Sequence, residues 1–98
     1  MAPAPAKANS VQKLLCSLFE QHGVTPYRCA KIIDAHHPQI YEVLRGDRAL
    51  SELLALKLAT YFQVEPETLL AAQTSERLTE LRKANSDVLA RIREKASQ

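Results

Sequence analysis

The stretch from Thr25 to Leu50 constrains the fold of this chain more than any other part. It holds two short apolar patterns with helical spacing, separated by a polar segment that contains Asp34 and ends at Pro38. Aspartate tolerates the left-handed backbone better than most residues with a Cβ, and proline suits the first turn of a helix. Because a residue before proline is disfavoured in helical geometry, we expect one helix to end before His37 and another, over roughly residues 38–45, to start there. Gly46 can then take the left-handed cap position.

The apolar residues of this stretch share one face of each expected helix, which is the layout of a helix-turn-helix. They are Cys29, Ala30 and Ile33 in the first helix and Ile40, Val43 and Leu44 in the second, and the apolar Ala35 lies in the segment between them. The preceding segment, with Ser10 as its N-cap and Gly23 ending it at His22, is expected to lay its own apolar face over this pair.

From Pro26 to Gly46 the pattern resembles, without gaps, the Cro/CI-like (xenobiotic-response-element) family of bacterial and phage DNA-binding domains. Ala30 matches the small residue where the two helices cross, and Arg45-Gly46-Asp47-Arg48 is similar to the family's polar-Gly-Lys-Arg ending. The segment LALKLATYFQVEPETLL resembles the one that follows the motif, so the likeness covers Val11 to about Gln73. It implies an all-α, five-helix lambda-repressor-like domain with a C-terminal helical extension.

Three parts are expected along the chain. Residues 1–9 are rich in alanine and proline without periodicity, which indicates a disordered arm. Residues 10–73 form the helix-turn-helix domain, and residues 74–98 form the extension. Ser51 should cap a fourth helix that is apolar over much of its circumference and therefore deeply buried, and Glu65-Pro66 should start a fifth.

The resemblance implies that the second helix of the motif lies in the major groove of DNA. With Ile40 and Val43 facing inward, its outward side chains become candidate base contacts. Gln39 can pair with adenine, Tyr41 can contact a phosphate or a thymine methyl, and Arg45 can bind guanine or a phosphate. Glu42 can accept from cytosine, or orient Arg45 or Arg28. The remaining candidates are His36 and His37 at the start of the helix, Arg48 just beyond it, and Thr25, Tyr27 and Arg28 for phosphates at the start of the first helix. Arg28 and Lys31 fit ordinary solvated charges equally well.

The C-terminal segment has apolar residues at alternating spacings of three and four, which is a heptad pattern. The row consists of Leu78, Leu81, Asn85, Val88 and Ile92, with an i,i+4 pair between Asp87 and Arg91. Two structures fit it: one long helix that dimerises with a second copy, or a break at Asn85-Ser86 with Ser86 capping a short helix that folds back. We expect homodimerisation through this segment.

The composition of the chain limits which partners and cofactors we expect. The chain has 98 residues, a net charge of +2 and 46% hydrophobic residues, which fits one small helical domain with modest affinity for nucleic acid per subunit. It has no apolar run that could span a bilayer and no apolar stretch typical of a signal peptide near Met1, so we expect a cytoplasmic protein without membrane contact. Cys16 and Cys29 are expected to be reduced core residues, and neither a zinc site nor another cofactor is expected.

The first functional hypothesis is a sequence-specific repressor that binds double-stranded DNA at an inverted repeat as a homodimer. A second is a HigA-type antitoxin that binds a toxin protein and represses its own operon, and a small phage regulator competes equally with it. A third is an interaction adaptor that does not bind DNA. An enzyme with a small-molecule substrate is the weakest hypothesis, because the sequence has no phosphate loop, metal cluster or activated nucleophile.

Overall fold

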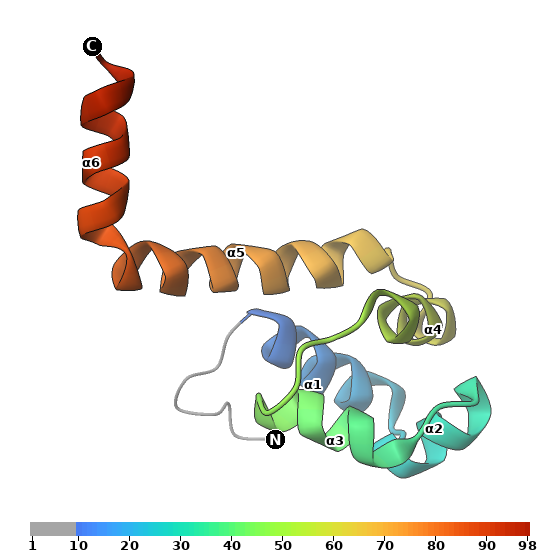
Figure 1. Ribbon diagram of the computed structural model, residues 1–98. Coiled ribbons are helices and arrows are strands. Elements are labelled where there is room, and N and C mark those ends of the chain that lie inside the picture. The colour runs from blue at the N-terminus through green and yellow to red at the C-terminus, as the bar shows by residue number, and fades with distance from the viewer. Residues whose placement is uncertain (1–9) are drawn as a thin grey trace.

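The computed structural model describes residues 10–98, which are all-helical: they form six helices and no strand (Figure 1). The expected arm at residues 1–9 lies outside the described residues. The described part measures 55 × 26 × 20 Å. The helices are α1 (Ser10–His22), α2 (Pro26–Ile33), α3 (His37–Arg45), α4 (Glu52–Phe62), α5 (Pro66–Ala84) and α6 (Ser86–Ala96).

The core lies where α1 to α4 meet the first turns of α5. Leu15, Ala55 and Leu58 are fully buried, and Leu69 brings α5 onto the same cluster. Phe19 packs edge-on against Phe62, with ring centroids 5.1 Å apart. Burying a side chain of this size contributes about 1.5–3 kcal/mol, so this cluster holds the bundle together.

Local sequence explains the connection between α2 and α3. The Thr25 hydroxyl accepts a hydrogen bond from the Arg28 amide at 3.2 Å, which confirms the expected cap before Pro26. Asp34 takes the left-handed conformation (φ 58°, ψ 55°), and Gly46 does the same after α3 (φ 85°), as the sequence predicts. The start of α3 differs slightly, because His36 is the extended residue and Pro38 occupies the second helical position. Either first-turn position accommodates proline, since an amide hydrogen there has no partner within the helix.

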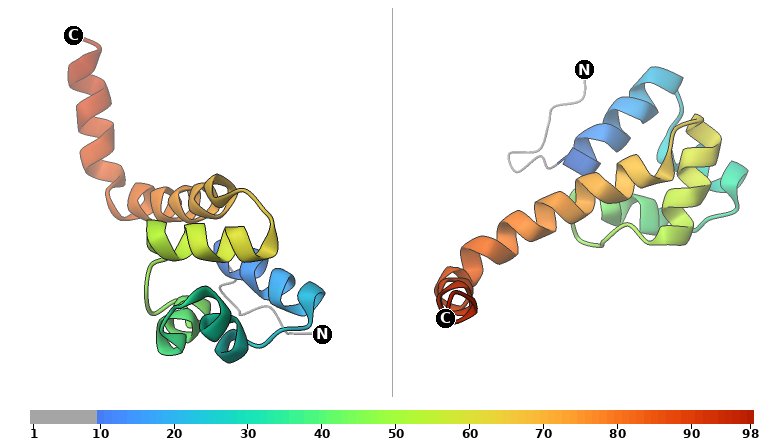
Figure 2. Two further views of the ribbon diagram at one scale, coloured as in Figure 1. Left: turned by 90° about the vertical axis from the view of Figure 1, so that its right-hand side faces the viewer. Right: turned by 90° about the horizontal axis from the view of Figure 1, so that it is seen from above.

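The fourth helix is less buried than expected. It buries Leu54, Ala55, Leu58, Ala59 and Phe62 on one face. Leu53 and Leu56, however, are 62% and 53% exposed. The expectation of burial around much of the circumference was therefore wrong, because α4 lies at the outside of the bundle and packs through one side only (Figures 1 and 2).

The chain bends at Asn85, where α5 ends and α6 begins. Its φ of −123° and ψ of 25° interrupt the helix, and its side chain donates to the Leu81 carbonyl at 2.9 Å. The break expected at Asn85-Ser86 is therefore confirmed, and one unbroken C-terminal helix is wrong. A segment that folds back is also wrong, because α6 points away from the bundle and buries none of its residues (Figures 1 and 2). Ser86 does not cap α6; it is the first residue of that helix.

Candidate nucleic-acid interface

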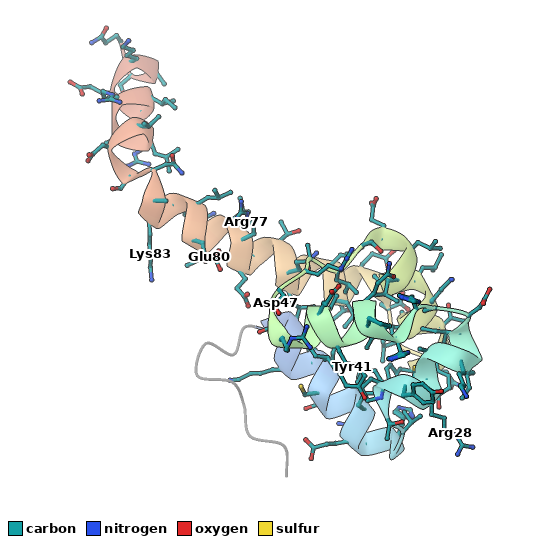
Figure 3. The ribbon with its side chains drawn as sticks, turned by 60° about the horizontal axis from the view of Figure 1, so that its bottom comes forward. Arg28, Tyr41, Asp47, Arg77, Glu80 and Lys83 are labelled. Atoms are coloured by element: carbon teal, nitrogen blue, oxygen red, sulfur yellow. The ribbon has the colours of Figure 1, made fainter. Side chains whose placement is uncertain are left out.

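Packing of α2 against α3 fixes which side of each helix is exposed. Cys29 and Ala30 of α2 and Ile40 and Val43 of α3 are buried in the core. The opposite side of the pair therefore carries polar and aromatic side chains. Figure 3 shows two of them, Arg28 on α2 and Tyr41 on α3.

Aromatic and imidazole rings join the starts of α2 and α3. The His37 ring lies 4.9 Å from that of Tyr27, edge to face, and 6.2 Å from that of Tyr41. The Lys31 ammonium sits 4.7 Å above the Tyr27 ring, within the range of a cation–π contact. Three residues that sequence analysis selected one by one, Tyr27, His37 and Tyr41, thus form one exposed cluster that bridges the two helices.

The two arginines near the end of α3 are already paired with acids. Arg45 lies 3.0 Å from Asp47, and Arg48 lies 2.7 Å from Glu42. The expectation that Glu42 orients Arg45 or Arg28 is therefore wrong, because the bend at Gly46 returns the chain so that Arg48 reaches Glu42 instead. Arg45, Asp47 and Arg48 are exposed to solvent and Glu42 is partly exposed, so each pair is worth about 0–1 kcal/mol and is readily broken by a stronger anion.

The remaining candidates separate by exposure. Gln39 and Glu42 are half-buried. The other candidates are exposed: Thr25, Tyr27, Arg28, His36, His37, Tyr41, Arg45 and Arg48. The side as a whole, from residue 25 to residue 48, carries four bases and three acids and is only weakly basic.

Three side chains that sequence analysis did not select hold this surface in place. The buried Gln12 amide donates to the Val43 carbonyl at 3.3 Å, and the Lys57 ammonium donates to the Asp34 carbonyl at 2.7 Å. Gln73 accepts from the Leu50 amide at 2.7 Å and donates to the Leu50 carbonyl at 2.9 Å. Only Gln12 gave a signal in the sequence, as a polar residue beside Val11 on the apolar face of its helix.

The thiols of Cys16 and Cys29 both have raised pKa values. Burial raises the pKa of the Cys29 thiol, and burial followed by the nearby Glu20 carboxylate raises that of Cys16. Both cysteines are free, and Cys16 is only half-buried rather than part of the core. Within residues 10–98 no three His, Cys, Asp or Glu side chains gather where they could hold a metal ion. No helix in that range combines the length and apolar character needed to cross a bilayer.

The expected dimerisation row is exposed. Leu78 and Leu81 lie on α5, and Val88 and Ile92 lie on α6, with the exposed Asn85 between them at the bend. The expected ion pair between Asp87 and Arg91 is not among those formed within residues 10–98.

Comparison with known proteins adds no relative: no protein-family model, no curated protein and no solved structure matches this chain.

Proposed function

We propose that this chain is a helix-turn-helix DNA-binding regulator of the five-helix lambda-repressor-like type, and that α3 lies in the major groove of its operator. The observation that carries the proposal is the division of α3 into two sides. Ile40 and Val43 are buried, whereas Tyr41 and Arg45, one helical turn apart, share an exposed side. An α-helix with its side chains is about 10–12 Å across, so α3 fits the major groove, which is about 12 Å wide.

The contacts divide into positioning and base reading. Thr25, Tyr27, Arg28 and Arg48 would contact phosphates on either side of the groove, and Gln39, Tyr41 and Arg45 would contact base edges. His36 and His37 stand where α3 would enter the groove. The Thr25 oxygen serves as the helix cap, and its hydroxyl proton remains able to donate to a phosphate.

The ion pairs at Arg45 and Arg48 lower the affinity but do not block binding. Phosphate accepts two hydrogen bonds from a guanidinium and competes well with an exposed carboxylate. Asp47 and Glu42 then remain close to the DNA, which makes affinity per subunit modest and strongly dependent on salt. Two copies on an inverted repeat, with half-sites about 34 Å apart, would provide the affinity that a repressor needs.

A second candidate is a protein that acts mainly by binding another protein. The neutralisation of Arg45 and Arg48 by acids favours it, as do the exposed Leu53 and Leu56. An adaptor would use such surfaces alone, whereas a HigA-type antitoxin would bind a toxin with them and bind its operator with α3.

Selection of bound sequences from a random duplex pool tests the proposal. We expect enrichment of an inverted repeat whose half-sites are one helical turn apart, with binding that weakens steeply as salt is raised. Absence of any enriched sequence, together with no shift of duplex DNA at low salt, would contradict DNA binding and leave the protein-binding candidate.

A further inference from the structure

The C-terminal arm, residues 74–96, carries an apolar row that no other part of residues 10–98 covers. Leu78 and Leu81 of α5 are 42% and 39% exposed, and Val88 and Ile92 of α6 are 43% and 57% exposed. An isolated helix as short as α6, with 11 residues, is marginal in water and gains most of its stability from packing. The row is therefore a surface that a partner would stabilise.

The row of α5 faces away from the bundle. With 3.6 residues per turn, Leu78 and Leu81 lie about 140–160° around the helix from Lys83. Lys83 points to the side opposite the one from which α6 leaves (Figure 3). Leu78 and Leu81 therefore lie on the side of α5 from which α6 leaves, away from the bundle.

Bases edge this row on both helices. On α5, Arg77 and Arg82 lie about 70° to either side of the line through Leu78 and Leu81. On α6, Arg91 and Lys95 lie along one edge of the line through Val88 and Ile92, about 80° and 40° away. The acids of the arm lie behind it, about 120° or more from the rows: they are Glu76, Glu80, Asp87 and Glu94.

These bases remain able to bind an anion. Arg82 and Arg91 form no ion pair within residues 10–98, and Arg77 has only an exposed contact of 3.7 Å with Glu80. A second copy packed in either direction along the row of α5, which has an arginine on each edge, would place its own arginines against these arginines. Along the row of α6, whose bases lie on one edge, a second copy would do so in the antiparallel direction. Like charges facing each other across an interface are unfavourable and select against that partner.

We propose that the arm binds an amphipathic helix of a different protein, one whose apolar residues recur at i, i+3, i+4 and i+7 and are edged by Asp or Glu. The partner's apolar side would lie along Leu78 and Leu81 of α5. Its carboxylates would face Arg77 and Arg82 on the two edges of that row. This protein-binding function uses α5, whereas the proposed DNA contacts lie on α2, α3 and the residues that follow α3.

Two designed helical peptides of equal apolar content test this, one edged by Glu and one edged by Lys. Fluorescence anisotropy of each labelled peptide with the full chain at low salt should show binding of the Glu-edged peptide alone. Leu81→Ser and Arg82→Glu should each weaken it by about tenfold or more. Lys83→Glu makes the same charge change at the next residue, on the opposite side of α5, and should leave binding unchanged. The double variant Arg77→Glu, Arg82→Glu should bind the Lys-edged peptide instead.

Several results would overturn the proposal. The first two are equal binding of the two peptides and binding of neither. A third is a chain that is dimeric at low salt but monomeric after Leu81→Ser, because a second copy would then be what covers the row. Stronger binding to vesicles of anionic phospholipid than to the Glu-edged peptide would mean that the arm binds a membrane surface instead. Circular dichroism confirms that each variant folds, and duplex binding measured on the same samples keeps a failure of the DNA proposal separate from a failure of this one.

Discussion

Gly46 and Gln12 together fix the end of α3. Gly46 has a φ of 85°, and a Cβ built on it would lie 2.6 Å from the Gln12 Nε2 atom. That nitrogen is held by its hydrogen bond to the Val43 carbonyl, so it cannot move aside without losing the bond. The hydrogen bond between Gln12 and Val43 joins residues 31 positions apart in the sequence and fixes the end of α3 against α1.

Gly46→Ala should therefore destabilise the protein by about 2–3 kcal/mol, from the left-handed backbone and the lost hydrogen bond together. Gly23→Ala is the matched control, because Gly23 has a φ of 59° but no atom within 4 Å of the added Cβ. It should cost only about 1 kcal/mol. Urea unfolding of both variants measures the difference, and equal costs would show that the Gln12 contact does not hold α3.

Arg45→Ala tests the reading side of α3 under the proposed function. Loss of its base or phosphate contact should weaken binding to the selected operator by about 1–3 kcal/mol. Arg93→Ala, which removes the same charge from α6, should weaken it far less. Fluorescence titrations at fixed salt give both values, and an operator affinity unchanged by Arg45→Ala would remove Arg45 from the set of reading residues.

Residues that act locally were predictable from sequence, and residues that act across the fold were not. Thr25, Asp34 and Gly46 were identified from their own conformational preferences, and each behaves as expected. The link between Lys57 and the Asp34 carbonyl depends on how α4 packs beside the turn, and so does not appear in any local pattern. The partner of Glu42 was missed for the same reason, since it depends on where the chain goes after Gly46.

At the scale of elements, periodicity predicted that helices exist but not how much of each is covered. The leucines of α4 gave the same signal whether buried, as Leu54 is, or exposed, as Leu53 is. The apolar residues of α5 and α6 keep the same helical spacing on both sides of Asn85, although the helix itself breaks there. The break depends on one residue whose side chain bonds to the backbone of the preceding turn.

Asn85→Leu should straighten the arm, because it removes the bond to the Leu81 carbonyl and replaces a weak helix former with a strong one. We expect higher helix content by circular dichroism and, in small-angle X-ray scattering, a radius of gyration above that of the parent chain. The radius of gyration of the bent form, calculated over the Cα atoms, is 16.4 Å. Ser86→Ala serves as the control and should change neither measurement, since Ser86 does not cap α6. A scattering profile unaffected by Asn85→Leu would show that the bend has another cause.

At the scale of the whole molecule, the bundle does not depend on α6. The core is complete with Leu69, and α6 buries no residue. A chain that ends at Ala84 should therefore unfold with a free energy within about 0.5 kcal/mol of the full chain. Leu69→Ala, which opens a cavity in the core, should cost about 2–5 kcal/mol. Urea unfolding compares the two, and a truncated chain that loses as much stability as Leu69→Ala would show that α6 supports the core.

The double hydrogen bond of Gln73 has a consequence for how the two ends of the molecule respond to each other. Gln73 lies on α5 between the buried Leu69 and the arm, and it grips both backbone groups of Leu50, two residues after Arg48. A molecule that binds the α5 part of the arm and turns that helix would therefore move the backbone of Leu50, two residues after Arg48. Binding at α5 would then change the position of Arg48 without any rearrangement of the core.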